Sequence, residues 1–133
     1  MVYMGSKNRL AKELIPIITA DLEEGMWYVE PFVGGCNMID KIQHPLRLGA
    51  DSNEYLMALL KYVQSGGELP EHIDKEEYLR VKANPDGYDK WYTGFCGFIA
   101  SRNGVFFSTY AGICNTKQGE RNYLREKRNN LLK

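Results

Sequence analysis

The sequence predicts an α/β fold, in which short buried strands alternate with helices. An aromatic and β-branched run at 27–32 has strand composition and ends just before the pair Gly34-Gly35. A second short apolar run, at 46–50, ends at Asp51. Segments with helical spacing of apolar residues precede, separate and follow these two runs. The resulting order, helix, strand, helix, strand, helix, is typical of a layered α/β protein.

The first helix is predicted from the spacing of its apolar residues. Leu10, Leu14 and Ile18 recur one helical turn apart. Ser6 precedes them and is placed to act as the N-cap. Pro16 lies inside the segment, so we expect it to kink or shorten this helix.

Two more helices are expected in this half of the chain. The glycine pair is predicted to open into a helix from Asn37 to Gln43, whose N-terminus would present N–H groups to a ligand. A third helix is expected to begin after Asn53 as its cap and to end at Gly66-Gly67. The apolar positions on one face of this helix are Leu56, Leu59, Leu60 and Val63.

The second half of the chain has a different composition. A charged helix at 73–83 leads into a strong turn signal at 84–87. The segment 88–100 is rich in aromatic residues interleaved with glycines, which predicts a buried, closely packed helix. Residues 101–116 are expected to form a projecting hairpin or loop, and 121–133 a basic helix.

Size and charge restrict the classes of protein that this chain can represent. Its 133 residues suffice for one domain with a single core. Lysine and arginine equal aspartate and glutamate at 17 each, so net charge alone does not indicate an anionic partner. The tail is nevertheless basic, and two readings stay open: a solvated helix face or a patch that faces phosphates. Its basic residues are Lys117, Arg121, Arg125, Lys127, Arg128 and Lys133.

The cysteines and the hydropathy pattern point to a reducing, intracellular compartment. Cys36, Cys96 and Cys114 are odd in number and widely spaced, which supports neither a disulfide framework nor a zinc site. No apolar run approaches the ~18 residues of a membrane span, and no signal-peptide pattern follows Met1. We therefore expect a cytoplasmic protein that holds no metal.

The glycine turn is the main candidate for a ligand site. Glycine lets the backbone approach a ligand closely, and Asp51 follows at roughly the ~20-residue interval expected of an acid that binds a ribose. Tyr3 and Lys7 flank Gly5, so an aromatic ring and a cation could face the same ligand. The alternative is that Tyr3 belongs to the core and Lys7 is solvated.

Four motifs carry a resemblance to a known family. In order they are Tyr-Met-Gly-Ser-Lys at 3–7, Val-Glu-Pro-Phe-Val-Gly-Gly at 29–35, Asp-Ser-Asn at 51–53, and Arg-Asn-Tyr at 121–123 before the basic helix. The sequence resembles the D12-class, N6-adenine DNA methyltransferases, and most of all the small phage-type DNA adenine methylases. The resemblance implies a partial Rossmann-like fold that binds S-adenosylmethionine, with a mainly helical target-recognition insert. It also implies a phage or prophage origin in a bacterial host, and a link to restriction and modification.

The resemblance assigns cofactor roles to individual residues. Tyr3 and Lys7 match the family's N-terminal cofactor motif, and Phe32 and Gly34 match its glycine-rich turn. Asp51 matches the acid that hydrogen-bonds the ribose of S-adenosylmethionine. A carboxylate suits the two hydroxyl donors of a ribose, while Lys7 or backbone N–H groups suit the methionine carboxylate.

The resemblance also divides the chain by role. Residues 1–67 correspond to the part that binds S-adenosylmethionine, 68–119 to the target-recognition insert, and 120–133 to a basic helix that returns to the catalytic domain. Cys36 departs from the pattern, because many members have a third glycine there. Polar side chains in and after the insert become candidate contacts to double-stranded DNA, although an ordinary loop that covers the core is the alternative. These candidates are Arg102, Asn103, Ser108, Thr109 and Arg121.

The largest departure from the family is a missing motif. Family members carry an Asp-Pro-Pro-Tyr-type tetrapeptide that receives the flipped adenine, and this sequence contains none. Residues 84–88 echo it only superficially. We therefore expect an N-terminal fragment or split half that is inactive until a complementary C-terminal half is supplied. The alternatives are an inactive DNA-binding protein, or one that pairs with a second copy of itself through an open sheet edge.

Overall fold

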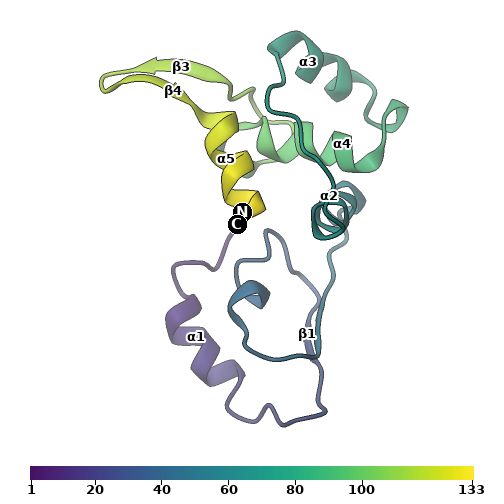
Figure 1. Ribbon diagram of the computed structural model, residues 1–133, viewed down its shortest axis with the longest axis vertical. Coiled ribbons are helices and arrows are strands. Elements are labelled where there is room, and N and C mark those ends of the chain that lie inside the picture. Colours follow the sequence, from purple (N-terminus) through teal and green to yellow (C-terminus); the bar gives the residue numbers. More distant parts are fainter. The chain divides into compact units, whose positions relative to one another are not determined.

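The computed structural model describes residues 1–133 as two units, which are treated one at a time below. Unit 1 comprises Met1 and residues 5–52, and unit 2 comprises residues 2–4 and 53–133. The chain mixes helices with two small two-stranded sheets, so it is a mixed helix and strand protein (Figure 1). None of its helices has both the length and the apolar character needed to cross a membrane.

Unit 1 is built around a parallel pair of strands. Helix α1 (Ala11–Ile18) precedes strand β1 (Tyr28–Glu30), and a 3₁₀ turn (Ile39–Lys41) leads to strand β2 (Arg47–Gly49). In the pair, Tyr28 lies opposite Arg47 and Glu30 opposite Gly49. The two strands and the helix before them follow the predicted order.

The predicted helix from Asn37 to Gln43 is wrong, because only the 3₁₀ turn forms there. The 3₁₀ turn spans only Ile39–Lys41. Ile42 is already extended at ψ of 115°, so the turn closes after one round. The segment therefore presents no α-helical N-terminus to a ligand.

Two details of the first helix also differ from the prediction. Its N-cap is Leu10, which makes no side-chain capping bond, whereas Ser6 Oγ accepts a hydrogen bond from the Asn8 N–H at 3.2 Å. A turn in which the Leu10 N–H donates to the Lys7 carbonyl separates Ser6 from the helix. The apolar stripe is only partly covered, since Leu10 and Ile18 are each about half exposed.

The strands of unit 1 are less buried than predicted. Tyr28 is buried, but Val29 on β1 is 51% exposed and Leu48 on β2 is 52% exposed. Successive strand residues point to opposite faces, so one face of this sheet is covered and the other is open.

Unit 2 is mainly helical. It contains α2 (Glu54–Gln64), α3 (Lys75–Ala83), α4 (Lys90–Gly94), a π-helical continuation (Phe95–Ile99) and α5 (Tyr123–Leu132). Asn53 caps α2 as predicted, since its Oδ1 accepts the Leu56 N–H at 2.9 Å. The core residues of this unit are mostly apolar and fully buried. They include Leu56, Leu59, Ile73, Tyr78, Val81, Phe95, Ile99 and Leu124.

The predicted aromatic helix is confirmed as the buried centre of unit 2. Every residue from 93 to 100 is buried. Gly94 lies against α2, where an added Cβ would overlap the Tyr55 carbonyl oxygen and lie 2.9 Å from its carbon. The interleaved glycine therefore permits a close approach of two helices.

The projecting hairpin lies later in the chain than predicted. Strands β3 (Ile113–Thr116) and β4 (Gly119–Asn122) pair antiparallel, and β4 leads directly into α5 (Figure 1). Residues 101–110 form a loop instead, closed by an isolated bridge between Ser101 and Tyr110. Turn residues such as Asn103-Gly104 occur in both hairpins and loops, so the sequence alone did not show which of the two forms here.

Candidate cofactor and DNA-binding sites

The candidate cofactor site lies at the carboxyl ends of the two parallel strands. Beyond the strands, the Ala50 N–H donates to the Glu30 carbonyl at 2.9 Å, and the Val33 N–H donates to the Ala50 carbonyl at 2.8 Å. These bonds hold the turn after β1 against the end of β2. In open parallel sheets, ligands bind outside the carboxyl ends of the strands, so this edge is the expected place for a nucleotide.

Gly34 and Asp51 meet at this edge. The Gly34 N–H donates a hydrogen bond to Asp51 Oδ2 at 3.1 Å, although the two residues are 17 positions apart. Gly34 is buried and has a φ of +48°, a left-handed conformation that favours glycine. The two central residues of the sequence-based site thus lie in one constellation.

Cys36 keeps the backbone shape that a glycine would give this turn. Its φ of +60° lies in the left-handed region that favours glycine, so here a residue with a side chain adopts the backbone shape of a glycine. The Cys36 N–H donates to the Val33 carbonyl at 2.9 Å, which fixes the turn. Burial raises the pKa of the Cys36 thiol, so it stays protonated at neutral pH.

Substitutions at Cys36 should separate backbone strain from side-chain packing. We expect Cys36→Gly to keep or raise stability, and Cys36→Val to lower it by about 1–2 kcal/mol, because a β-branched residue is strained at positive φ. Urea denaturation followed by circular dichroism measures both. Cys114→Gly in strand β3 is the control and should cost about 0.5–1 kcal/mol. Equal losses at the two cysteines would contradict this account of the turn.

The segment that carries Lys7 is tied to the glycine turn through Asn37. Asn37 Nδ2 donates to Ser6 Oγ and to the Met1 carbonyl, both at 2.8 Å. Lys41 Nζ adds a bond to Asn8 Oδ1 at 2.7 Å. The sequence did not indicate Asn37 as a linking residue, because an asparagine near a glycine pair is typical of an ordinary turn.

The remaining predicted cofactor residues have different surroundings. Lys7 is exposed, and its Nζ donates to the Gly5 carbonyl at 3.0 Å. Phe32 is 85% exposed at the start of the turn. Tyr3 belongs to unit 2, where its ring lies 5.7 Å from that of Phe98. The structure thus brings Gly34 and Asp51 into direct contact, and it places Phe32 and Lys7 on segments bonded to the same turn.

Four of the predicted DNA contacts share the loop at 101–110. The Arg102 N–H donates to the Thr109 carbonyl at 2.7 Å, and Ser108 Oγ donates to the Arg102 carbonyl at 3.2 Å. Asn103 has a φ of +57° at the tip of this loop. All four side chains are exposed, so the loop presents polar groups to solvent.

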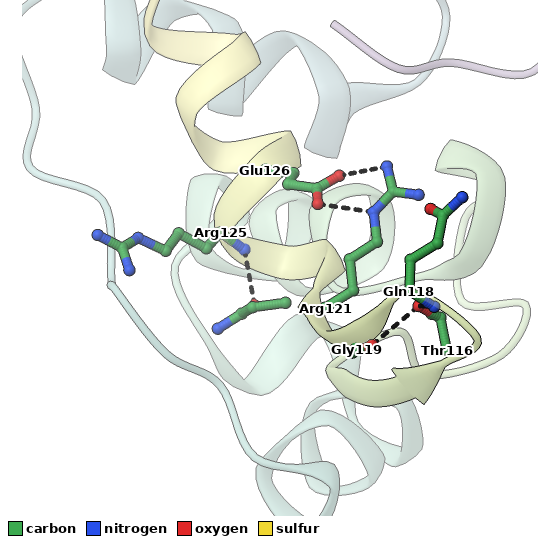
Figure 2. A network of polar contacts seen from close by, with 7 residues as sticks. Thr116, Gln118, Gly119, Arg121, Arg125 and Glu126 are labelled. Atoms are coloured by element: carbon green, nitrogen blue, oxygen red, sulfur yellow. Dashed lines mark hydrogen bonds and ion pairs between the residues drawn. The ribbon is translucent and has the colours of Figure 1, made fainter.

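Arg121, the fifth predicted DNA contact, lies on β4 and not in the basic helix. Its guanidinium forms two hydrogen bonds to Glu126 (Figure 2). The guanidinium carbon also lies 4.7 Å from the centre of the Tyr123 ring. The Glu126 carboxylate raises the pKa of Arg121 further above its usual range, so this side chain stays charged.

Two cations of the basic tail point inward. For these two, both expectations for the tail, a solvated helix face and a patch that faces phosphates, are wrong. Lys127 is only 7% exposed, and its Nζ donates to the Ser101 carbonyl. Arg128 donates twice to the Leu69 carbonyl, at 3.1 and 3.2 Å. The outward-facing cations of the tail and hairpin are Lys117, Arg121, Arg125 and Lys133.

Lys127 should make stability depend on pH. Burial lowers its pKa from 10.5 to about 8, so the unfolded chain binds more protons than the folded chain between these values. Relative to Lys127→Met, the wild-type chain should gain about 1–2 kcal/mol as the pH rises from 8 to 10.5, a value reduced for partial hydration of the ammonium. Urea titrations at several pH values measure this difference. The exposed control Arg125→Met should show no such rise, and a flat difference for Lys127→Met would contradict the burial of its charge.

The comparisons with known proteins identify the family of this chain. No group of three or more histidine, cysteine, aspartate or glutamate side chains is placed to hold a metal ion. No curated protein matches the chain. The family model for D12 class N6 adenine-specific DNA methyltransferase matches residues 3–126, which is most of the sequence. The chain therefore belongs to the D12 class of N6 adenine-specific DNA methyltransferases.

Proposed function

We propose that this chain supplies the S-adenosylmethionine site and the DNA-contacting surface of a site-specific DNA adenine N6-methyltransferase. The observation that carries the proposal is the hydrogen bond from the Gly34 N–H to Asp51 Oδ2 at the carboxyl ends of β1 and β2. It joins a left-handed glycine turn to a carboxylate at the edge where nucleotides bind.

The predicted cofactor residues of unit 1 suit the chemical groups of S-adenosylmethionine. Asp51 offers carboxylate oxygens to the ribose hydroxyl donors. Lys7 offers a cation to the methionine carboxylate, and the exposed ring of Phe32 offers a stacking surface to the adenine. When bound, the cofactor supplies an electrophilic methyl group on its sulfonium.

The role of these residues is to bind and orient. Methyl transfer requires an in-line approach of the adenine amino nitrogen to the methyl group, so positioning supplies much of the rate. The Asp-Pro-Pro-Tyr-type motif, which would position the adenine, is not among residues 1–133. We propose that a segment carrying such a motif, on the same polypeptide or on a separate one, completes the site. A phage origin and a link to restriction and modification stay predictions of the resemblance.

Complementation tests this function. The chain alone should transfer no tritiated methyl group from S-adenosylmethionine to DNA. Co-expression with the Asp-Pro-Pro-Tyr-containing half of another D12-class methylase should restore transfer to adenine N6. The Asp51→Ala variant should lose that restored activity, while Asp40→Ala, an exposed acid in the same unit, should keep it. Turnover by the chain alone, or no activity with any complementary half, would contradict the proposal.

The second candidate function is binding without chemistry. The hairpin β3–β4 is almost fully exposed and carries Lys117 and Arg121, which favours a DNA-binding role. The open face around Val29 and Leu48 favours self-association. Duplex binding at low salt together with a failure of every complementary half would support the first of these. A dimer mass by light scattering would support the second.

A further inference from the structure

The junction between the hairpin and α5 holds Arg121 in one orientation. Thr116 Oγ1 donates to the Gly119 carbonyl at 2.8 Å and closes the hairpin turn. At the other end of β4, Asn122 caps α5, because its Oδ1 accepts the Arg125 N–H at 2.9 Å (Figure 2). This cap starts the helix directly after the strand, so Glu126 in the first turn of α5 reaches back to Arg121.

The guanidinium of Arg121 is engaged along one edge and one face. Nε donates to Glu126 Oε1 at 2.7 Å, and Nη2 donates to Glu126 Oε2 at 2.8 Å. The ring of Tyr123 lies 4.7 Å from the guanidinium carbon. A planar group held by two parallel hydrogen bonds and a ring face keeps its plane and its direction.

The opposite edge of the guanidinium lies outside this ion pair. An arginine has five N–H donors in a fixed fork, and Glu126 takes one on Nε and one on Nη2. The end of the fork, Nη1 with the second N–H of Nη2, is the edge that matches the O6 and N7 acceptors of guanine. Arg121 and Glu126 are both about half exposed, so a partner can reach this end.

The same ion pair disfavours a simple phosphate contact. The carboxylate of Glu126 cancels the charge of Arg121 and would repel a phosphate brought close to it. Because the pair is neutral, it would release few counterions from DNA and add little affinity for phosphate. A guanidinium with a fixed direction is better suited to hydrogen-bond a base edge, where direction matters more than charge.

We propose that Arg121 reads one guanine in the major groove of the DNA substrate, and that Glu126 and Tyr123 are positioning residues for it. A two-stranded ribbon such as β3–β4 fits this groove. The inference rests on the proposed DNA-modifying function and deepens it, because it places a G·C pair in the recognition site.

The test uses the full chain and a pool of duplexes with a randomised central segment. Sequencing of the bound fraction gives the base preference at each position, and fluorescence anisotropy gives the affinity. We expect the wild-type chain to prefer at least one G·C pair. Arg121→Gln should lower that preference at least about fivefold and leave the other positions unchanged. Arg121→Lys, which keeps the charge but loses the fork, should do the same.

The positioning role has its own matched control. Glu126→Gln should weaken the same G·C preference, while Glu120→Gln should leave it unchanged. Glu120 precedes Arg121 on β4 and so lies on the opposite face of the strand, and the two variants remove the same charge. Circular dichroism melting verifies that each variant folds.

Each outcome decides between failure of the inference and failure of the proposed function. No duplex binding by the wild-type chain would overturn the DNA-binding function, and the inference with it. Duplex binding with every base preference intact in Arg121→Gln would overturn the inference alone. A Glu126→Gln variant that binds more tightly with its G·C preference unchanged would show that Glu126 competes with phosphate and does not position Arg121.

Discussion

Replacing Asp51 by alanine should lower the affinity of the chain for S-adenosylmethionine at least about tenfold, since hydrogen bonds to a charged group are worth about 1.5–3 kcal/mol. The variant loses the carboxylate proposed to bind the ribose. It also leaves the Gly34 N–H without the acceptor that it has at 3.1 Å. Both effects act on one place, so calorimetric titration should show the loss directly.

Two further variants separate these effects. Asp51→Asn keeps an oxygen that can accept the Gly34 N–H but removes the charge, so its affinity should fall between those of wild type and Asp51→Ala. Asp40→Ala removes an exposed carboxylate from the same unit and should bind like wild type. An affinity for Asp51→Ala equal to that of Asp40→Ala would contradict the assignment of Asp51.

Replacing Gly94 by alanine should destabilise unit 2 by about 3 kcal/mol and lower its melting temperature by roughly 10–20 °C. The new Cβ would overlap the backbone of Tyr55 and lie 3.1 Å from Leu59 Cβ. Backbone cannot move aside as a flexible side chain can, so α2 and α4 must separate. Thermal unfolding followed by circular dichroism measures the loss.

The matched control for this substitution is Gly66→Ala. Gly66 has a φ of +82°, and an added Cβ there would meet no atom within 4 Å. This variant should therefore show only the conformational cost of about 1 kcal/mol. Equal losses at the two glycines would mean that steric overlap with Tyr55 does not control the packing of α4.

Local patterns predicted much of the fold. The cap at Asn53, the helix that follows it, and the buried aromatic segment at 93–100 are all found, because capping and apolar spacing act within a few residues. The pairing of β1 with β2 also follows from the alternation of helices and strands. The cap and the helices depend on interactions that are short in sequence, whereas the strand pairing joins residues 19 positions apart and follows from the order of the elements.

The errors arose where a longer-range contact competes with a local preference. Ser6 bonds to Asn37 from a distant segment and does not cap the first helix. Lys127 looks like a surface cation but donates to Ser101, which lies 26 residues away. No periodicity in the sequence indicates such contacts. The basic tail was therefore predicted to be exposed throughout, although two of its cations point inward.

Only part of the candidate site could be predicted from the sequence. The interval between the glycine turn and Asp51 is typical of a turn and an acid at the ends of two neighbouring parallel strands. In the structure the two strands pair in this way, and Gly34 is hydrogen-bonded to Asp51. The ion pair of Arg121 with Glu126 depends on where β4 ends and α5 begins, and the sequence placed both residues in one helix.

The central claim is that Gly34 and Asp51 form one binding site for S-adenosylmethionine. The most direct measurement is a titration of the ¹⁵N-labelled chain with S-adenosylmethionine, followed through its backbone amide resonances. The account predicts saturable shifts that are largest at the amide of Gly34 and at the residues next to Asp51. An unmoved Gly34 resonance at millimolar cofactor, or shifts confined to residues 53–133, would contradict it.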